Sequence, residues 1–151
     1  MDVVPCITFK EQENTVLPKR ETQGSFGYDL TVSEDVSVPP RNAARIKTGL
    51  YLSQDLPCEH DLGVAMLILP RSSTLQKYGL IVGNSPGLID ADYGEEIEIL
   101  VYNLTDQHIL VAKGLRIAQA LFVPVLLPCM GSVVPSEDDE RSRQGFGSTG
   151  E

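Results

Sequence analysis

The chain has 151 residues, 42% of them hydrophobic, and a formal net charge of −9. This length allows one domain with a sizeable core, and this apolar content excludes a wholly disordered chain. The acidic balance argues against nucleic acid as the main partner, because phosphate backbones bind basic surfaces. An anionic small molecule would need a local cluster of basic side chains, a cation, or both.

Cysteine usage and apolar runs indicate a reducing compartment and no membrane. Cys6, Cys58 and Cys129 are odd in number and far apart, which fits neither a disulfide framework nor a zinc site. The first residues lack the basic start and apolar core of a signal peptide. The longest apolar run, residues 115–128, is too short and too interrupted to span a membrane. We therefore expect a cytoplasmic protein, or one in another reducing compartment such as the nucleus of a host cell.

Most of the chain has the pattern of short strands separated by polar turns. Before residue 71, four segments have the composition of strands: 3–9, 35–40, 44–53 and 62–70. In the third segment Ile46, Leu50 and Leu52 share a parity, as one face of a half-buried strand requires. The fourth, LGVAMLILP, is a continuous apolar run and is typical of a buried strand.

The segment after the fourth strand contains a candidate anion site. Residues 74–78, TLQKY, are ordinary helix formers and predict a short helix. Arg71, Ser72 and Ser73 stand at its start. Backbone N–H groups at a helix start, with hydroxyl groups and a guanidinium beside them, can bind an anion. A simple N-cap with a surface arginine explains the same residues, and local chemistry leaves both interpretations open.

The stretch GNSPGLIDADYGEE, residues 83–96, lies between two apolar runs and has the composition of a tight loop between strands. Asp90 and Asp92 flank Ala91. In a strand, residues two apart share a face, so both carboxylates would point the same way. Such a pair suggests a metal site or an acid/base pair, and the alternative is a polar hairpin with solvated acids.

The last third of the chain predicts three more strands and a tail. The strands are expected at 96–104, 106–114 and 115–127. Residues 131–144 are polar and charged and predict a mobile linker. The final GFGSTGE has a Gly-rich backbone that could cradle phosphates, and a loose C-terminus is the alternative.

Many short strands with frequent proline and glycine predict an all-β sandwich or jelly roll with few or no helices. We expect residues 1–130 to form a single β jelly-roll domain. Residues 131–151 would form a flexible linker and a Gly-rich C-terminal lid.

Five short sequence blocks follow one another between Gly24 and Gly150. They are GSFGYDL (24–30), PRSS (70–73), GLIDADY (87–93) with Gly83 and Asn84 upstream, KGLRIAQALF (113–122) and GFGSTG (145–150). Together and in this order they resemble the trimeric deoxyuridine triphosphate pyrophosphatase (dUTPase) family. The resemblance implies a jelly-roll homotrimer with active sites at subunit interfaces. It also implies hydrolysis of dUTP to dUMP and pyrophosphate with Mg²⁺ on the triphosphate, which limits uracil incorporation into DNA and supplies dUMP for dTMP synthesis.

The resemblance further implies roles for individual residues. Asp90 would be the general base that activates the water attacking the α-phosphorus. The uracil and deoxyribose would be bound by Asn84, Gly87, Leu88, Ile89, Tyr93 and Phe146. The phosphates would be bound by Arg71, Ser72, Ser73, Gln119, Arg141, Gly147, Ser148 and Thr149. Asp29 would hold water molecules of the metal. Arg143 is an alternative to Arg141 at the γ-phosphate.

Several positions depart from the pattern of the family. Ser73 and Glu95 stand where glycines are usual, and Phe26 replaces a small residue. Leu115 stands where an aspartate is common, so we expect Arg116 to lose a structural ion pair.

Two other functions are consistent with parts of the pattern. A dCTP deaminase shares the fold and an Arg-Ser-Ser corner, but its base is a glutamate three residues before an asparagine, and here Leu100 precedes Asn103. The other alternative is a non-catalytic binding or structural protein with a dUTPase-like fold. Intact Asp90, Arg71 and Phe146 argue against that second alternative.

Overall fold

The computed structural model of the chain describes residues 5–13 and 15–132. Most of its elements are strands. In chain order they are β1 (Tyr28–Thr31), β2 (Val36–Val38), β3 (Ala43–Lys47), β4 (Cys58–Glu59), β5 (Leu62–Pro70), α1 (Thr74–Tyr78), β6 (Leu80–Val82), β7 (Gly87–Ile89), β8 (Glu98–Asn103), β9 (Ile109–Val111) and β10 (Arg116–Leu126).

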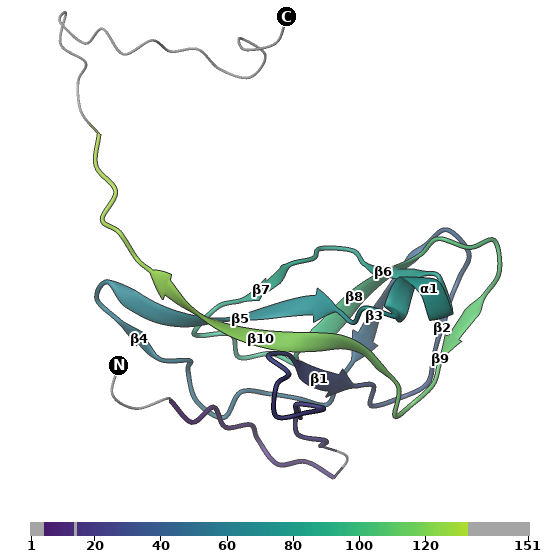
Figure 1. Cartoon of the computed structure of the whole chain (residues 1–151), viewed down its shortest axis with the longest axis horizontal. Coiled ribbons are helices and arrows are strands. Elements are labelled where there is room, and N and C mark those ends of the chain that lie inside the picture. Colours follow the sequence, from purple (N-terminus) through teal and green to yellow (C-terminus); the bar gives the residue numbers. More distant parts are fainter. Residues whose placement is uncertain (1–4, 14, 133–151) are drawn as a thin grey trace, which may run out of the picture.

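The strands form antiparallel sheets that face one another (Figure 1). The larger sheet has the order β1-β10-β5-β4, and β7 also pairs with β5. A second sheet has the order β3-β8-β6, and β2 pairs with β9. The long β10 pairs with all of β5, which leaves the other edge of β5 for β4 and β7.

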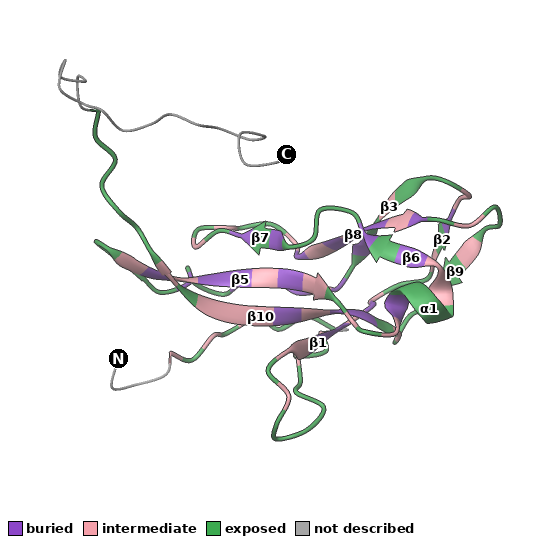
Figure 2. Ribbon diagram, turned by 45° about the horizontal axis from the view of Figure 1, so that its top comes forward, coloured by how far each residue is buried: buried purple, intermediate pink, exposed green. Residues whose placement is uncertain are grey.

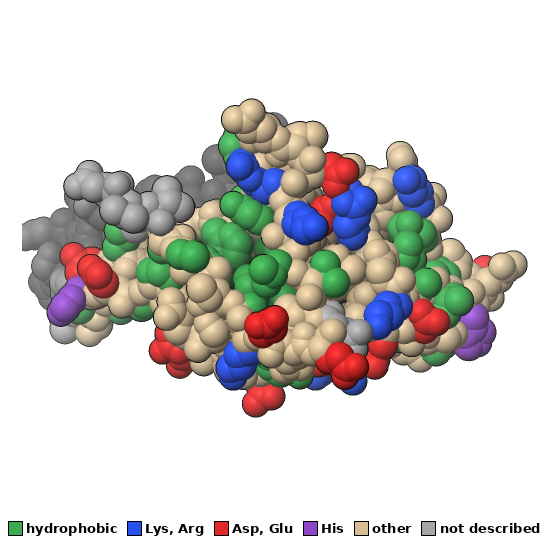
Figure 3. Space-filling view, turned by 90° about the horizontal axis from the view of Figure 1, so that it is seen from below, with side chains coloured by type: hydrophobic (Ala, Val, Ile, Leu, Met, Phe, Trp, Pro, Cys, Tyr) green, Lys and Arg blue, Asp and Glu red, His purple; other side chains and the backbone are tan. Residues whose placement is uncertain are grey.

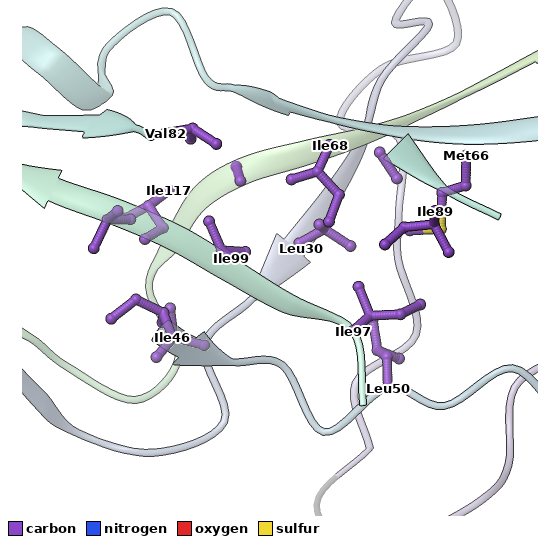
Figure 4. Close-up of a cluster of buried hydrophobic side chains, with 14 of the residues drawn as sticks. Leu30, Ile46, Leu50, Met66, Ile68, Val82, Ile89, Ile97, Ile99 and Ile117 are labelled. Atoms are coloured by element: carbon purple, nitrogen blue, oxygen red, sulfur yellow. The ribbon is translucent and has the colours of Figure 1, made fainter. Parts of the chain in front are cut away.

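The core lies between the sheets and consists of aliphatic side chains. β8 shows why: its residues alternate between half-buried and buried, so Ile99 and Val101 face inward (Figure 2). Figure 4 shows side chains from both sheets meeting there, with Ile99 and Ile117 among them. Each such fully buried side chain contributes about 1.5–3 kcal/mol relative to exposure, so this core holds the strand ends in place.

The all-β fold predicted from the sequence is confirmed. The expected buried strand at 62–70 and the expected helix at 74–78 have these same bounds in the structure. No helix in the described ranges 5–13 and 15–132 is long and apolar enough to cross a membrane.

Two strand predictions were wrong. The described residues of segment 3–9 form no strand: Phe9 makes an isolated bridge with Leu52, and the Thr8 carbonyl accepts from the Ser53 N–H at 3.0 Å. The strand expected at 44–53 ends at Lys47, because Gly49 has a positive φ of 69° and the Thr48 hydroxyl bonds to the Ile97 carbonyl. The inward parity of that segment nevertheless holds, since Ile46, Leu50 and Leu52 are all buried.

Candidate active site

Three strand ends bring a buried carboxylate and two arginines together. Asp29 on β1 lies opposite Gln119 on β10, and Arg71 follows the last residue of β5. Asp29 Oδ1 accepts from Arg71 Nε at 2.8 Å, and Oδ2 accepts from Arg116 Nη1 at 3.0 Å. The Asp29 side chain is only 8% exposed, so it needs such partners, because an unpaired buried charge is strongly destabilising.

Arg71 is fixed by further hydrogen bonds to the neighbouring strand. Its backbone N–H donates to the Ile117 carbonyl, and its Nη1 donates to the Arg116 carbonyl, each at 3.3 Å. The Arg71 side chain keeps 28% of its surface exposed. Its remaining guanidinium N–H groups can therefore meet an anion from solvent.

Arg116 has a carboxylate partner that the sequence did not reveal. We expected this arginine to lose an ion pair because Leu115 precedes it, but its Nη1 donates to Glu21 as well as to Asp29. The hydrogen bond and charge of Glu21, together with Asp29, raise the pKa of Arg116 above its ordinary value. Glu21 lies outside every predicted sequence block, and only the folded chain brings it here.

Gly27 and Gln119 are in close contact across β1 and β10. A Cβ atom at Gly27 would lie 2.0 Å from Gln119 Oε1, which is far inside contact distance. The Gln119 Nε2 in turn donates to the Pro70 carbonyl at 3.0 Å. The absence of a side chain at Gly27 therefore allows the carboxamide to lie beside Arg71.

The start of α1 does not form a simple N-cap. Ser73 occupies the N-cap position with helical dihedrals (φ −94°, ψ −4°), and its side chain makes no capping hydrogen bond. The Thr74 hydroxyl donates to the Ile117 carbonyl at 2.6 Å and anchors the turn to β10. Ser72 is exposed and Ser73 is half-buried, so both lie at the surface next to Arg71.

The loop between β6 and β7 forms a polar turn over the sheet. Its Ser85–Pro86 peptide bond is cis, and the Ser85 N–H donates to the Val82 carbonyl at 3.3 Å. Gly87 leaves room for the Asn84 carboxamide, which lies 3.4 Å from where a Gly87 Cβ would be. The structure therefore brings Asn84 beside the start of β7.

Asp90 and Asp92 do not share a strand face, contrary to the sequence prediction. β7 ends at Ile89, and the chain then turns, with the Tyr93 N–H donating to the Asp90 carbonyl at 3.3 Å. The turn removes the alternation on which the paired-carboxylate interpretation depended. Both acids are exposed, and Asp90, directly after β7, remains the candidate base.

Tyr93 is held by a network centred on Glu96. The Tyr93 hydroxyl donates to the Glu96 carbonyl at 3.1 Å. The Glu96 carboxylate accepts from the Gly49 N–H at 2.8 Å and from the Tyr51 hydroxyl at 3.1 Å. The hydrogen bond to Glu96, aided by desolvation, raises the pKa of Tyr51. No sequence pattern indicated that Glu96 holds Tyr93 in place. In the sequence Glu96 is only the second of two adjacent acidic residues at the end of a predicted loop.

Within one chain, the candidate residues form two separate groups. β10 pairs along one edge of β5 and β7 pairs along the other. Arg71 binds Asp29 on the β10 side. Ile89 lies opposite Met66 and Asp90 follows it, so at least five residues of β5, roughly 17 Å of strand, also separate Asp90 from Arg71.

The predicted tail residues cannot be placed on this site. Arg141, Arg143, Phe146, Gly147, Ser148 and Thr149, and the linker from residue 133, lie outside the described residues.

Comparisons with known proteins agree on one family. A family model described as dUTPase matches residues 13–150. A deoxyuridine 5'-triphosphate nucleotidohydrolase from Picosynechococcus is 39% identical over 141 residues, covering 93% of this chain and 95% of the relative. The dUTPase of Staphylococcus bacteriophage 80alpha, solved with dUPNHPP, is 27% identical with a TM-score of 0.79, covering 97% of this chain and 99% of that one. A mutant dUTPase of the S. aureus phage phi11, with a structural Mg(II) ion, is 22% identical with a TM-score of 0.71, covering 85% and 97%.

Proposed function

The chain belongs to the dUTPase family, and on that premise we propose that it hydrolyses dUTP to dUMP and pyrophosphate. It is a hydrolase of nucleotide metabolism, a dUTP diphosphatase. The observation that carries this conclusion is the family match over residues 13–150, which spans all five sequence blocks.

Asp90 is the proposed general base. Its exposed carboxylate at the end of β7 can take a proton from a water molecule as the water oxygen attacks the α-phosphorus. The bond from the α-phosphorus to the oxygen bridging toward the β-phosphate then breaks, so dUMP is formed and pyrophosphate leaves.

Uracil recognition is assigned to the β6–β7 loop and to β7 itself. Among the described strands β7 pairs only with β5, so its other edge keeps backbone N–H and C=O groups for the polar edge of a base. This edge comprises Gly87, Leu88 and Ile89, with the Asn84 carboxamide beside it. Tyr93, fixed through Glu96, would pack beneath the deoxyribose and exclude a 2′-hydroxyl.

The phosphates are assigned to the group around Arg71. Its guanidinium carries the charge. Ser72 and Ser73 follow it in the chain, and Gln119 lies on the neighbouring strand β10, with its carboxamide bonded to the Pro70 carbonyl. Phe146 of the tail is assigned to stacking on the uracil. The other tail residues assigned to phosphate binding are Arg141, Gly147, Ser148 and Thr149.

Mg²⁺ is expected to arrive with the triphosphate. No group of three or more His, Cys, Asp or Glu within residues 5–13 and 15–132 could hold a metal ion. Mg²⁺ commonly keeps several waters and binds substrate phosphates with one or two carboxylates. Both Asp29 oxygens already accept from arginines, so Asp29 fits contact with metal-bound water. The bound ion would neutralise charge on the phosphates.

The assembly expected is a homotrimer with sites between subunits. The wide separation of Asp90 from Arg71 in one chain supports a site completed by a second copy. A groove of about 550 Å³ with apolar walls, Phe9 and Phe122 among them, supports an interface as well. Figure 3 shows apolar side chains gathered on one face, beside basic and acidic ones.

Light scattering should give about three times the chain mass of 16.5 kDa, and a monomer mass would contradict this assembly.

Gly27→Ala is expected to impair phosphate binding without impairing folding. A methyl group at residue 27 displaces the Gln119 carboxamide, and losing one hydrogen bond to a charged group costs about 1.5–3 kcal/mol. The KM for dUTP should therefore rise by roughly tenfold or more. Gly24→Ala is the matched control, because nothing lies within 4 Å of a Cβ there. An unchanged KM in Gly27→Ala would exclude the role of Gln119.

The proposed function is tested by product analysis with four nucleotides. We expect pyrophosphate from dUTP and far less from dTTP, dCTP and UTP. Ammonia from dCTP would indicate a deaminase. Such an enzyme would carry its catalytic base on the strand after the hairpin, at the position of Leu100. Here Leu100 is apolar and lies against Gly83. Neither product would indicate a non-catalytic binder.

A further inference from the structure

Glu21 is a charged residue of the loop before β1, and none of the roles proposed for dUTP hydrolysis involves it. The backbone N–H of Asp29 donates to the Lys19 carbonyl at 2.7 Å, so this loop starts and ends beside the site. The loop carries Glu21, whose side chain is 59% exposed, to the guanidinium of Arg116.

The contact of Glu21 is the first link of a continuous chain of ion pairs. Arg116 Nη1 donates to Glu21 and to Asp29 Oδ2, and Asp29 Oδ1 accepts from Arg71 Nε. The charges alternate along this chain and balance, with two carboxylates and two guanidinium groups. Side-chain exposure falls from 59% at Glu21 to 43% at Arg116 and 8% at Asp29.

We propose that Glu21 is a positioning residue for the triphosphate, acting through Arg116 and Asp29 on Arg71. The inference rests on the proposed function, since it requires Arg71 to bind phosphate. Glu21 holds the Arg116 guanidinium against one oxygen of Asp29, and the carboxylate so oriented fixes Arg71 Nε with its other oxygen. Arg71 then presents its remaining N–H groups in one geometry before the nucleotide arrives, which lowers the entropy lost on binding.

The expected size of the effect follows from the exposure of the pair. Exposed ion pairs contribute modestly, so Glu21→Gln should weaken triphosphate binding and raise KM by about two- to fivefold. The change acts on substrate and transition state alike, so kcat should stay close to the wild-type value. Glu21→Asp keeps the charge on a shorter side chain and should restore part of the affinity.

The test uses the full chain and titration with the imido analogue dUpNHpp, alongside thermal melting and dUTP kinetics. Glu34→Gln is the matched control, because Glu34 is 52% exposed and pairs with Lys47 at 3.2 Å, apart from this chain of ion pairs. We expect Glu21→Gln to lose about two- to fivefold in affinity for the analogue and Glu34→Gln to lose none. The melting temperatures of both variants should stay close to that of the wild-type chain, because exposed ion pairs contribute little to stability.

A double-mutant cycle separates positioning from general support of the fold. In an Arg71→Lys background the chain of ion pairs has lost its last guanidinium, so adding Glu21→Gln should weaken analogue binding no further. The same loss in both backgrounds, or a lowered melting temperature that accounts for it, would overturn the role of Glu21. So would equal affinity of Glu21→Gln and Glu34→Gln. A wild-type chain that neither binds the analogue nor releases pyrophosphate would contradict the proposed function itself, and this inference with it.

Discussion

Asp90→Asn should lower kcat for dUTP by a factor of about 10²–10⁴ while leaving nucleotide affinity almost unchanged. The substitution keeps the size and polarity of the side chain and removes its capacity to accept a proton from water. The Asp90 side chain is exposed after the end of β7, so the change removes no packing from the core. Initial rates of pyrophosphate release and titration with dUpNHpp measure the two quantities separately.

Asp92→Asn is the matched control for this prediction. Asp92 is also exposed and lies in the same turn, two residues further along the chain. Both variants lose one negative charge from the same part of the surface, so a general electrostatic effect would appear in both. A large loss confined to Asp90→Asn identifies the base, whereas near-normal turnover in that variant would exclude it.

The fold could be predicted from the sequence where local pattern and long-range packing agree. The apolar run 62–70 and the helix formers 74–78 are such cases, because burial and propensity favour the same structure there. The segment 44–53 is the opposite case. Its alternation correctly predicted which residues are buried, but the backbone turns at Gly49. Because the buried residues keep the same alternation on both sides of the turn, the pattern of apolar residues does not reveal it.

The candidate site was predictable as a set of residue types but not as a geometry. Sequence blocks predicted roles for Asp29, Arg71 and Asp90 by resemblance, yet no pattern indicated that Asp29 is shared between two arginines. That sharing joins residues 29, 71 and 116, which the pairing of β1, β10 and β5 brings together, and the loop before β1 adds residue 21. Ion pairs over such sequence distances leave no periodic signal.

A related cause explains the wrong prediction for the loop after β7. Two aspartates at a spacing of two suggested a shared face, because alternation holds inside a strand. The strand ends one residue before Asp90, and strand ends are the least certain part of any prediction from sequence. The support of Tyr93 by Glu96 was missed because it depends on contacts with residues 49 and 51.

The separation of Asp90 from Arg71 in one chain leads to a subunit-mixing experiment with a large expected effect. If each site takes its base from one subunit and its phosphate-binding arginine from another, two inactive variants can complement each other. Asp90→Asn lacks the base, and Arg71→Ala lacks the arginine, while Asp29 keeps Arg116 as a partner so that the second variant can fold. Each variant alone should show turnover reduced by a factor of about 10² or more.

Unfolding and refolding the two variants together at equal amounts should restore turnover. In a randomly mixed trimer, the subunit that supplies Asp90 and the one that supplies Arg71 are each intact in half of the cases, so about a quarter of the sites are complete. The mixture should therefore reach about a quarter of wild-type activity, measured as pyrophosphate release. Each variant refolded by itself controls for the procedure and should stay inactive. Sites built within a single chain would give no recovery at all, because every chain in the mixture lacks one of the two residues.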